Sequence, residues 1–124
     1  MPAEAITEKQ IQNEIIRFLG TNPAVRVWRS NTGVARFGKQ VVRFGIKGQA
    51  DITGIFSVEG LACPLWIEVK SSNGVQTKEQ KDFQNMIEKF NGLYILARSV
   101  QDVENAISIY RNRIISILGK SSKN

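Results

Sequence analysis

The chain has 124 residues, of which 42% are hydrophobic, and its 17 Lys and Arg against 11 Asp and Glu give a formal net charge of +6. This length and hydrophobic content predict one domain with a real core and exclude a disordered chain. The sequence contains no histidine and one cysteine, Cys63, which excludes Ser-His-Asp and Cys-His catalysis, histidine or all-cysteine zinc sites and an internal disulfide. Any catalysis must therefore rest on carboxylates, lysine and a hard metal ion bound by oxygen.

The composition also indicates a compartment and a partner. No apolar run approaches the length of a membrane span, and residues 1–10 lack the pattern of a signal peptide, so we expect no membrane partner. The single cysteine suits a reducing cytoplasm. The excess of positive charge favours a polyanionic partner such as nucleic acid.

Hydrophobic periodicity and turn signals predict, in chain order, a helix over residues 7–19, strands over 25–29, 41–44, 51–57 and 65–70, a helix over 77–90, a strand over 93–97 and a helix over 100–118. Thr7 and Thr77 are the expected N-caps of the first two helices, with Gln10 and Gln80 three residues later as in a capping box. Residues 1–118 are expected to form a single domain, and residues 119–124 a flexible tail.

The order of these elements predicts the fold class. The strand–helix–strand crossover from Leu65 to Ala97 implies a parallel pair of strands, whereas the earlier strands are close enough in sequence for antiparallel hairpins. We therefore expect an α/β fold, with a single-domain mixed β-sheet flanked by helices.

The strand over residues 65–70 alternates between Leu65, Ile67 and Val69 on one apolar face and Trp66, Glu68 and Lys70 on the other. Burying a carboxylate and an amine on a covered face is costly unless partners compensate. The second face is therefore either wet or holds a functional site. Asp51 opens the preceding strand, and in a hairpin it lies across from the Glu68–Lys70 end.

Two carboxylates placed this closely repel each other, and a divalent cation relieves the repulsion. Mg²⁺ takes oxygen ligands and typically binds through one or two carboxylates plus a substrate phosphate. We expect Asp51, Glu68 and the Val69 carbonyl to bind Mg²⁺ or Mn²⁺. Lys70 is then placed to orient or help deprotonate a water, or to stabilise the transition state of phosphate chemistry.

These residues form a recognisable motif: Gly48-x-x-Asp51, then Glu68-Val69-Lys70, then a helix that opens with Gln80. The motif resembles the PD-(D/E)XK nuclease superfamily, and more narrowly the stand-alone form of the VRR-NUC (virus-type replication-repair nuclease) domain. The resemblance covers roughly residues 10–97. It departs from the family's pattern at Ala50, because the family's aspartate often follows a proline.

The resemblance implies a restriction-endonuclease-like αβββαβ core and a metal-dependent DNA endonuclease. It implies that Asp51 and Glu68 are metal ligands, that Lys70 is the catalytic lysine and that Gln80 reaches back to Lys70 or the phosphate. A glutamate of the first helix is common in such nucleases, and Glu14 matches it. At about 100° per residue, Glu14 lies about 40° from Phe18 on the rim of the apolar stripe, so we expect it to face the sheet. The family also implies branched DNA, including four-way junctions, as substrate.

A homodimer is expected for work on two DNA strands, with the apolar C-terminal helix as a candidate dimer face. A basic segment, residues 25–50, contains no acidic residue and carries aromatic residues among its cations, so it can follow a phosphate backbone. The expected DNA-binding residues are Arg26, Arg29, Asn31, Arg36, Lys39, Arg43, Lys47, Ser71 and Lys78.

Each residue also has an ordinary structural interpretation. Glu68 and Lys70 can belong to a solvated edge strand, Asp51 can cap a turn, and Gln80 can do no more than complete a capping box. Glu14 can be exposed, and the basic segment can be a solvated hairpin. The alternative function is a DNA-binding module of the same fold without chemistry. A sequence-specific restriction-type enzyme is less expected, because the chain is short for a separate base-reading domain.

Overall fold

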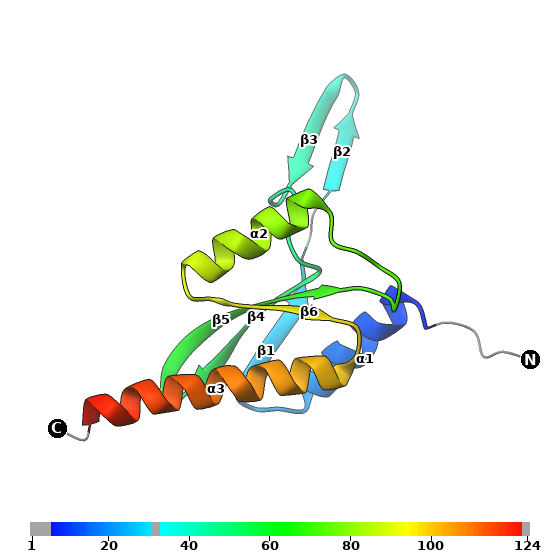
Figure 1. Ribbon diagram of the computed structural model, residues 1–124. Helices are drawn as coiled ribbons and strands as arrows, with labels where there is room; N and C mark the ends of the chain where they lie inside the picture. Colours follow the sequence, from blue (N-terminus) through cyan, green and yellow to red (C-terminus); the bar gives the residue numbers. More distant parts are fainter. Residues whose placement is uncertain (1–5, 31–32, 123–124) are drawn as a thin grey trace, which may run out of the picture.

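The computed structural model describes residues 6–30 and 33–122 of the chain (Figure 1). The elements are, in order, α1 (Glu8–Gly20), β1 (Val25–Arg29), β2 (Gly33–Phe37), β3 (Gln40–Phe44), β4 (Ile52–Val58), β5 (Leu61–Val69), α2 (Lys78–Lys89), β6 (Leu93–Ala97) and α3 (Val100–Ser122). Within the described residues, none of the helices is long and apolar enough to cross a bilayer.

Four strands form a mixed sheet in the order β1-β4-β5-β6. β1, β4 and β5 pair in antiparallel fashion, and β6 pairs with β5 in parallel, because α2 carries the chain back across the sheet. The α/β fold with a mixed sheet flanked by helices is therefore confirmed, and α1, β1, β4, β5, α2 and β6 make the expected αβββαβ core.

β2 and β3 form a separate two-stranded antiparallel ribbon, inserted between β1 and β4. Figure 1 shows this ribbon, in cyan, projecting away from the four-stranded sheet beyond the N-terminal end of α2. We call it the β2–β3 ribbon.

The helices cover the two faces of the sheet unequally. α1 and α3 lie on one face and α2 on the other (Figure 1). The main core lies under α1 and α3 and includes Ile15, Ile52, Leu65, Ile67 and Val103, all 0% exposed. A smaller cluster under α2 joins Ala50, Phe83, Ile87 and Tyr94, with Trp66 packed against it.

The structure differs from the sequence prediction in three elements. β5 begins at Leu61 rather than at residue 65, and it passes through Pro64. Pro64 precedes the first pair between β5 and β6, so it lies where the strand has one neighbour and tolerates proline. β2 was not predicted, because its side chains are largely exposed on both faces and show no alternation of burial.

α3 runs to Ser122, so residues 119–122 of the expected tail are helical, and residues 123–124 lie outside the described residues.

Candidate active site

The two faces of β5 are as the alternation predicted, but both are buried. Leu65, Ile67 and Val69 are 0% exposed under α1 and α3. On the α2 face, Glu68 is 2% exposed and Lys70 9%. The interpretation of Glu68 and Lys70 as a solvated edge is therefore wrong. Burying two charged groups is unfavourable in free energy unless other groups pair with them or hydrogen-bond to them.

Asp51 meets this end of β5 from the neighbouring strand. Ile52, the first residue of β4, pairs with Ile67, which places Asp51 beside Glu68 and Val69. The Val69 N–H donates a hydrogen bond of 2.8 Å to Asp51 Oδ2, which holds the Asp51 carboxylate at the sheet edge. The Asp51 carboxylate lies close enough to Glu68 for its charge to disfavour the ionised form of Glu68.

The environment of Glu68 disfavours its charged form. Burial, the charge and hydrogen bond of Asp51 and the charge of Glu8 together raise the pKa of Glu68 to about 8, with burial the largest cause, while the charge of Lys70 lowers it. Lys70 Nζ lies 3.7 Å from Glu68 Oε2. Among the described residues, Glu68 Oε1 is buried and accepts no hydrogen bond.

An orphaned carboxylate oxygen beside a second carboxylate fits a hard divalent cation, which takes oxygen ligands and relieves the repulsion. Asp51 and Glu68, with the Val69 carbonyl, are the residues that suit it. Within the described part of the chain, no group of three or more Asp, Glu, His or Cys side chains is arranged to hold a metal. Two carboxylates are the number with which Mg²⁺ commonly binds protein.

Gln80 connects the start of α2 to this site. The Thr77 side chain caps α2, and Gln80 completes the capping box, with its Oε1 accepting from the Thr77 N–H at 2.9 Å. The other end of the same amide, Nε2, donates to Glu68 Oε2 at 3.1 Å. Gln80 therefore completes the helix cap and also holds Glu68, whereas Lys70 or a phosphate was the partner expected for it.

Gly48 allows α2 to approach the chain just before Asp51. Its φ of +80° is a conformation that side chains rarely adopt, and a Cβ there would lie 2.2 Å from the Glu79 carbonyl oxygen. Glycine is therefore required at this position by the backbone and by its neighbour.

The glutamate of α1 nearest the site is Glu8, which the sequence analysis missed. The prediction that Glu14 faces the sheet is wrong, because Glu14 is exposed. Glu8 is half-buried, and its charge acts on Glu68. A Cβ at Gly74 would lie 3.3 Å from Glu8 Oε1 and 3.2 Å from Lys70 Cβ, so these three residues meet.

The signal for Glu8 was present in the helical spacing. Glu8 lies three, seven and eleven residues before Ile11, Ile15 and Leu19, the three residues that α1 buries. At about 100° per residue, these four side chains share one face of the helix.

The expected DNA-binding residues divide into several groups. Arg36, Lys39 and Arg43 are exposed on the β2–β3 ribbon. Lys47 comes after the ribbon in the chain, and its Nζ lies 3.7 Å from Glu79 Oε1. Asn31 lies outside the described residues.

Three of the other expected DNA contacts have partners within the protein, whereas Arg26 lines a pocket described below. Arg29 donates to Gln12 Oε1 at 2.5 Å and to Asn13 of α1. Lys78 Nζ lies 3.0 Å from Asp82 Oδ2. The Ser71 carbonyl accepts from Arg98 Nη1 at 2.5 Å.

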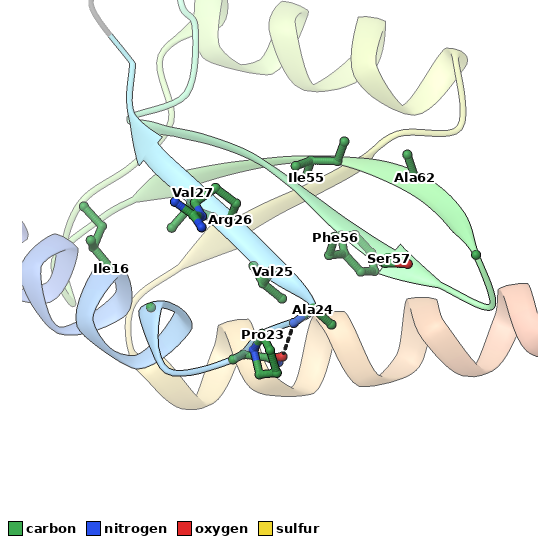
Figure 2. Close-up of a pocket in the computed structure, with 13 residues that line it drawn as sticks. Ile16, Pro23, Ala24, Val25, Arg26, Val27, Ile55, Phe56, Ser57 and Ala62 are labelled. Carbon is green, nitrogen blue, oxygen red and sulfur yellow. Dashed lines mark hydrogen bonds between the residues drawn. The ribbon is translucent and has the colours of Figure 1, made fainter.

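A pocket of about 650 Å³ lies elsewhere, along the edge strand β1 and the turn between β4 and β5 (Figure 2). Its lining, which includes Val25, Ile55, Phe56 and Ala62, contains one charged residue, Arg26. Asp51, Glu68 and Lys70 do not line it. The candidate active site is the group of Asp51, Glu68 and Lys70 around the end of β5, and it is separate from this pocket.

No family model matches the sequence, and no curated protein matches it. Among solved structures, the chain is similar to a VRR_NUC domain protein, with a TM-score of 0.59 and 20% sequence identity. The similarity covers 87% of this chain and 90% of that one. The chain therefore has the fold of a VRR-NUC domain protein, as the resemblance of its motif predicted.

Proposed function

Because this chain has the VRR-NUC fold and gathers two carboxylates and a lysine at one sheet edge, we propose that it is a metal-dependent endonuclease that hydrolyses DNA phosphodiester bonds. The observation that carries the proposal is Glu68. This carboxyl is 2% exposed, lies beside Asp51 and has one oxygen without a partner among the described residues. Such an arrangement is costly for a protein that does not use it.

Asp51, Glu68 and the Val69 carbonyl would hold Mg²⁺ or Mn²⁺. Such an ion, when bound, makes a coordinated water easier to deprotonate and offsets negative charge on a phosphate. The Val69 N–H fixes Asp51, and Gln80 fixes Glu68, so the ligands are oriented before any ion binds.

Among the residues that the structure describes, Lys70 is the one buried cation at this site. Its ammonium group, 3.7 Å from Glu68 Oε2, can donate to the attacking water or to a phosphoryl oxygen while it partly neutralises the carboxylates. Because Lys70 has three donors and its burial keeps solvent away, we assign it the catalytic role.

The basic segment supports DNA as the substrate. Six Lys and Arg and no Asp or Glu occur between Val25 and Ala50, and the chain continues from there directly into Asp51. We propose branched DNA, including four-way junctions, as the preferred form. We also propose a homodimer, because a two-fold axis presents two sites to two strands.

The competing function is a DNA-binding module without chemistry. It needs the basic segment but not a buried glutamate and lysine beside a second carboxylate, which is why we favour the nuclease. The two functions differ in whether DNA is cut.

The test is cleavage of labelled linear duplex, flap and four-way junction DNA, with and without Mg²⁺ or Mn²⁺. We expect metal-dependent products from the wild type, and a fall in rate of about a hundredfold or more for Lys70→Ala with DNA binding retained. Lys89→Ala is the matched control, because it removes an exposed lysine from the last turn of α2. Tight binding of these DNAs without any metal-dependent product would contradict the nuclease and support the DNA-binding module.

A further inference from the structure

The β2–β3 ribbon stands apart from the body of the protein. All five residues of β3 are exposed, and so are four of the five residues of β2. A two-stranded hairpin is marginally stable in water on its own, and apolar side chains on an uncovered one have no folding role in the core. These include Phe37 and Phe44, which are 62% and 46% exposed.

The strand register sorts the ribbon's side chains into two faces, because directly paired residues point to the same side. Ala35 pairs with Val42, Phe37 with Gln40 and Gly33 with Phe44, and we call this side the aromatic face. Val34 pairs with Arg43 and Arg36 with Val41, and we call this side the arginine face.

The base of the ribbon adjoins the candidate active site. The Ser30 N–H, just before the ribbon, donates to the Asp51 carbonyl at 2.8 Å. After the ribbon, the chain passes Lys47 and Gly48 against the first turn of α2 and then reaches Asp51. A five-residue strand spans about 17 Å, so the ribbon reaches about five nucleotides along a DNA strand from the site.

Charge decides between DNA and a second copy of the chain as the partner of this surface. Arg36, Lys39 and Arg43 lie on the ribbon, and no acidic residue occurs from Val25 to Ala50. Two ribbons packed against each other would bring these cations together, which is unfavourable. A phosphate backbone is complementary to them.

The aromatic face indicates which form of DNA the β2–β3 ribbon binds. Phenyl rings stack on bases that are unpaired and accessible, whereas the bases of an intact duplex are already stacked on one another. We infer that the β2–β3 ribbon is a wedge for the boundary between duplex and unpaired DNA, with Phe37 and Phe44 stacking on unpaired bases and Arg36 and Arg43 contacting phosphates. The inference rests on the proposed function for its DNA partner, but it concerns binding, which is measurable without cleavage.

The test compares a forked DNA, with 2-aminopurine at its first unpaired position, with the fully paired duplex of the same sequence, in the presence of a chelator. For Phe37→Ala and Phe44→Ala we expect affinity for the fork to fall about fivefold to a hundredfold and the 2-aminopurine signal of unstacking to be lost. Affinity for the duplex should change less than about twofold.

Val34→Ala and Val41→Ala are the matched controls, since they shorten side chains of similar exposure, 51% and 53%, on the other face of the same ribbon. They should leave the fork preference unchanged. Arg36→Gln and Arg43→Gln should weaken binding to both DNAs and lower the salt slope by about one each.

Three results would overturn the inference. The first is an equal loss of affinity for fork and duplex in the phenylalanine variants, and the second is a loss of fork affinity in the valine variants equal to that in the phenylalanine variants. The third is a fall in the mass of the protein in solution on Phe37→Ala. The last would assign the aromatic face to contact between copies.

The two proposals can be rejected separately. If fork preference depends on Phe37 but no DNA is cut, the proposed nuclease activity is contradicted and the proposed wedge is supported. If DNA is cut and the phenylalanine variants bind forks normally, the wedge is contradicted and the nuclease is supported.

Discussion

Glu68 carries the strongest electrostatic conflict in the described structure. Its pKa of about 8 in the folded protein lies above its ordinary value of 4.5, chiefly because the carboxyl is buried and lies beside Asp51. Between these two pH values the folded state keeps a proton that the unfolded state releases. Folding stability contributed by this group is therefore highest below about pH 4.5 and is lost as the pH rises toward 8.

This linkage predicts a specific pH dependence for the metal-free protein. We expect the free energy of unfolding to fall by about 2–4 kcal/mol between pH 5 and pH 8 through this one group. Glu68→Gln should remove most of that fall, because a neutral amide has no proton to lose. Urea unfolding with a chelator present measures it, and Glu104→Gln, at an exposed position of α3, is the control. Parallel curves for the wild type and Glu68→Gln would contradict the buried-charge explanation.

Glu8 and Glu14 provide a matched pair on one helix. Glu8 lies close to Gly74, as Lys70 does, and its charge acts on Glu68, whereas Glu14 is exposed. Removing the Glu8 charge should weaken the attraction of the site for a divalent cation. We expect Glu8→Gln to raise the Mg²⁺ concentration for half-maximal cleavage about three- to tenfold, equivalent to about 0.7–1.4 kcal/mol.

Glu14→Gln should leave the Mg²⁺ requirement within about twofold of the wild type. A Mg²⁺ titration of cleavage rates measures both variants. An equal effect of the two substitutions would show that a general change of net charge, rather than proximity to the site, is responsible.

At the scale of elements, the position of α2 determines the site. The capping box starts α2 at Lys78, which brings Gln80 onto Glu68, and Gly48 lets the chain before Asp51 approach Glu79. The strand edge and the helix start therefore meet through one hydrogen bond and one close backbone approach. A change in either should disturb the carboxylates without touching them.

Gly48→Ala tests this arrangement against Gly60→Ala. The two glycines have similar φ angles, +80° and +81°, but a Cβ at Gly60 meets nothing within 4 Å. We expect Gly60→Ala to cost about 1–2 kcal/mol for its backbone conformation. Gly48→Ala should cost about 1–3 kcal/mol more, because its Cβ overlaps the Glu79 carbonyl, and should also abolish cleavage.

Urea unfolding gives the two stabilities, and the cleavage assay gives the effect on the site. Equal losses of stability for the two variants would mean that the approach of α2 is not held by Gly48.

At the scale of the whole molecule, α3 is longer than the sheet requires. Its 23 residues include Ile109, 69% exposed, and Ile115, 39% exposed. If the homodimer forms through this helix, burying these side chains would supply part of its free energy.

Ile109→Asp tests this dimer without entering the core, since the side chain is exposed. We expect the mass in solution to fall from that of two chains to that of one, with the unfolding midpoint at fixed low concentration nearly unchanged. Light scattering measures the mass, and Ile55→Asp, at an exposed position of β4 on the sheet face away from α3, is the control. A wild type of single-chain mass would contradict the homodimer itself.

Much of the fold was predictable from the sequence, because the signals are local. The alternation in β5 assigned Leu65 and Ile67 to one face and Glu68 to the other before any partner was known. Thr7 and Thr77 marked the starts of two helices, since a capping box involves residues three apart in sequence. The crossover through α2 required a parallel pair because its two strands must run the same way.

Only the tertiary structure decided how the site is completed. It showed that Glu68 is buried rather than solvated, that Glu8 rather than Glu14 faces the site, and that Gln80 holds Glu68. It also revealed β2 as the partner of β3. Each of these depends on elements far apart in the chain packing together, and burial, charge coupling and strand pairing between such elements leave no pattern in the residues immediately around them.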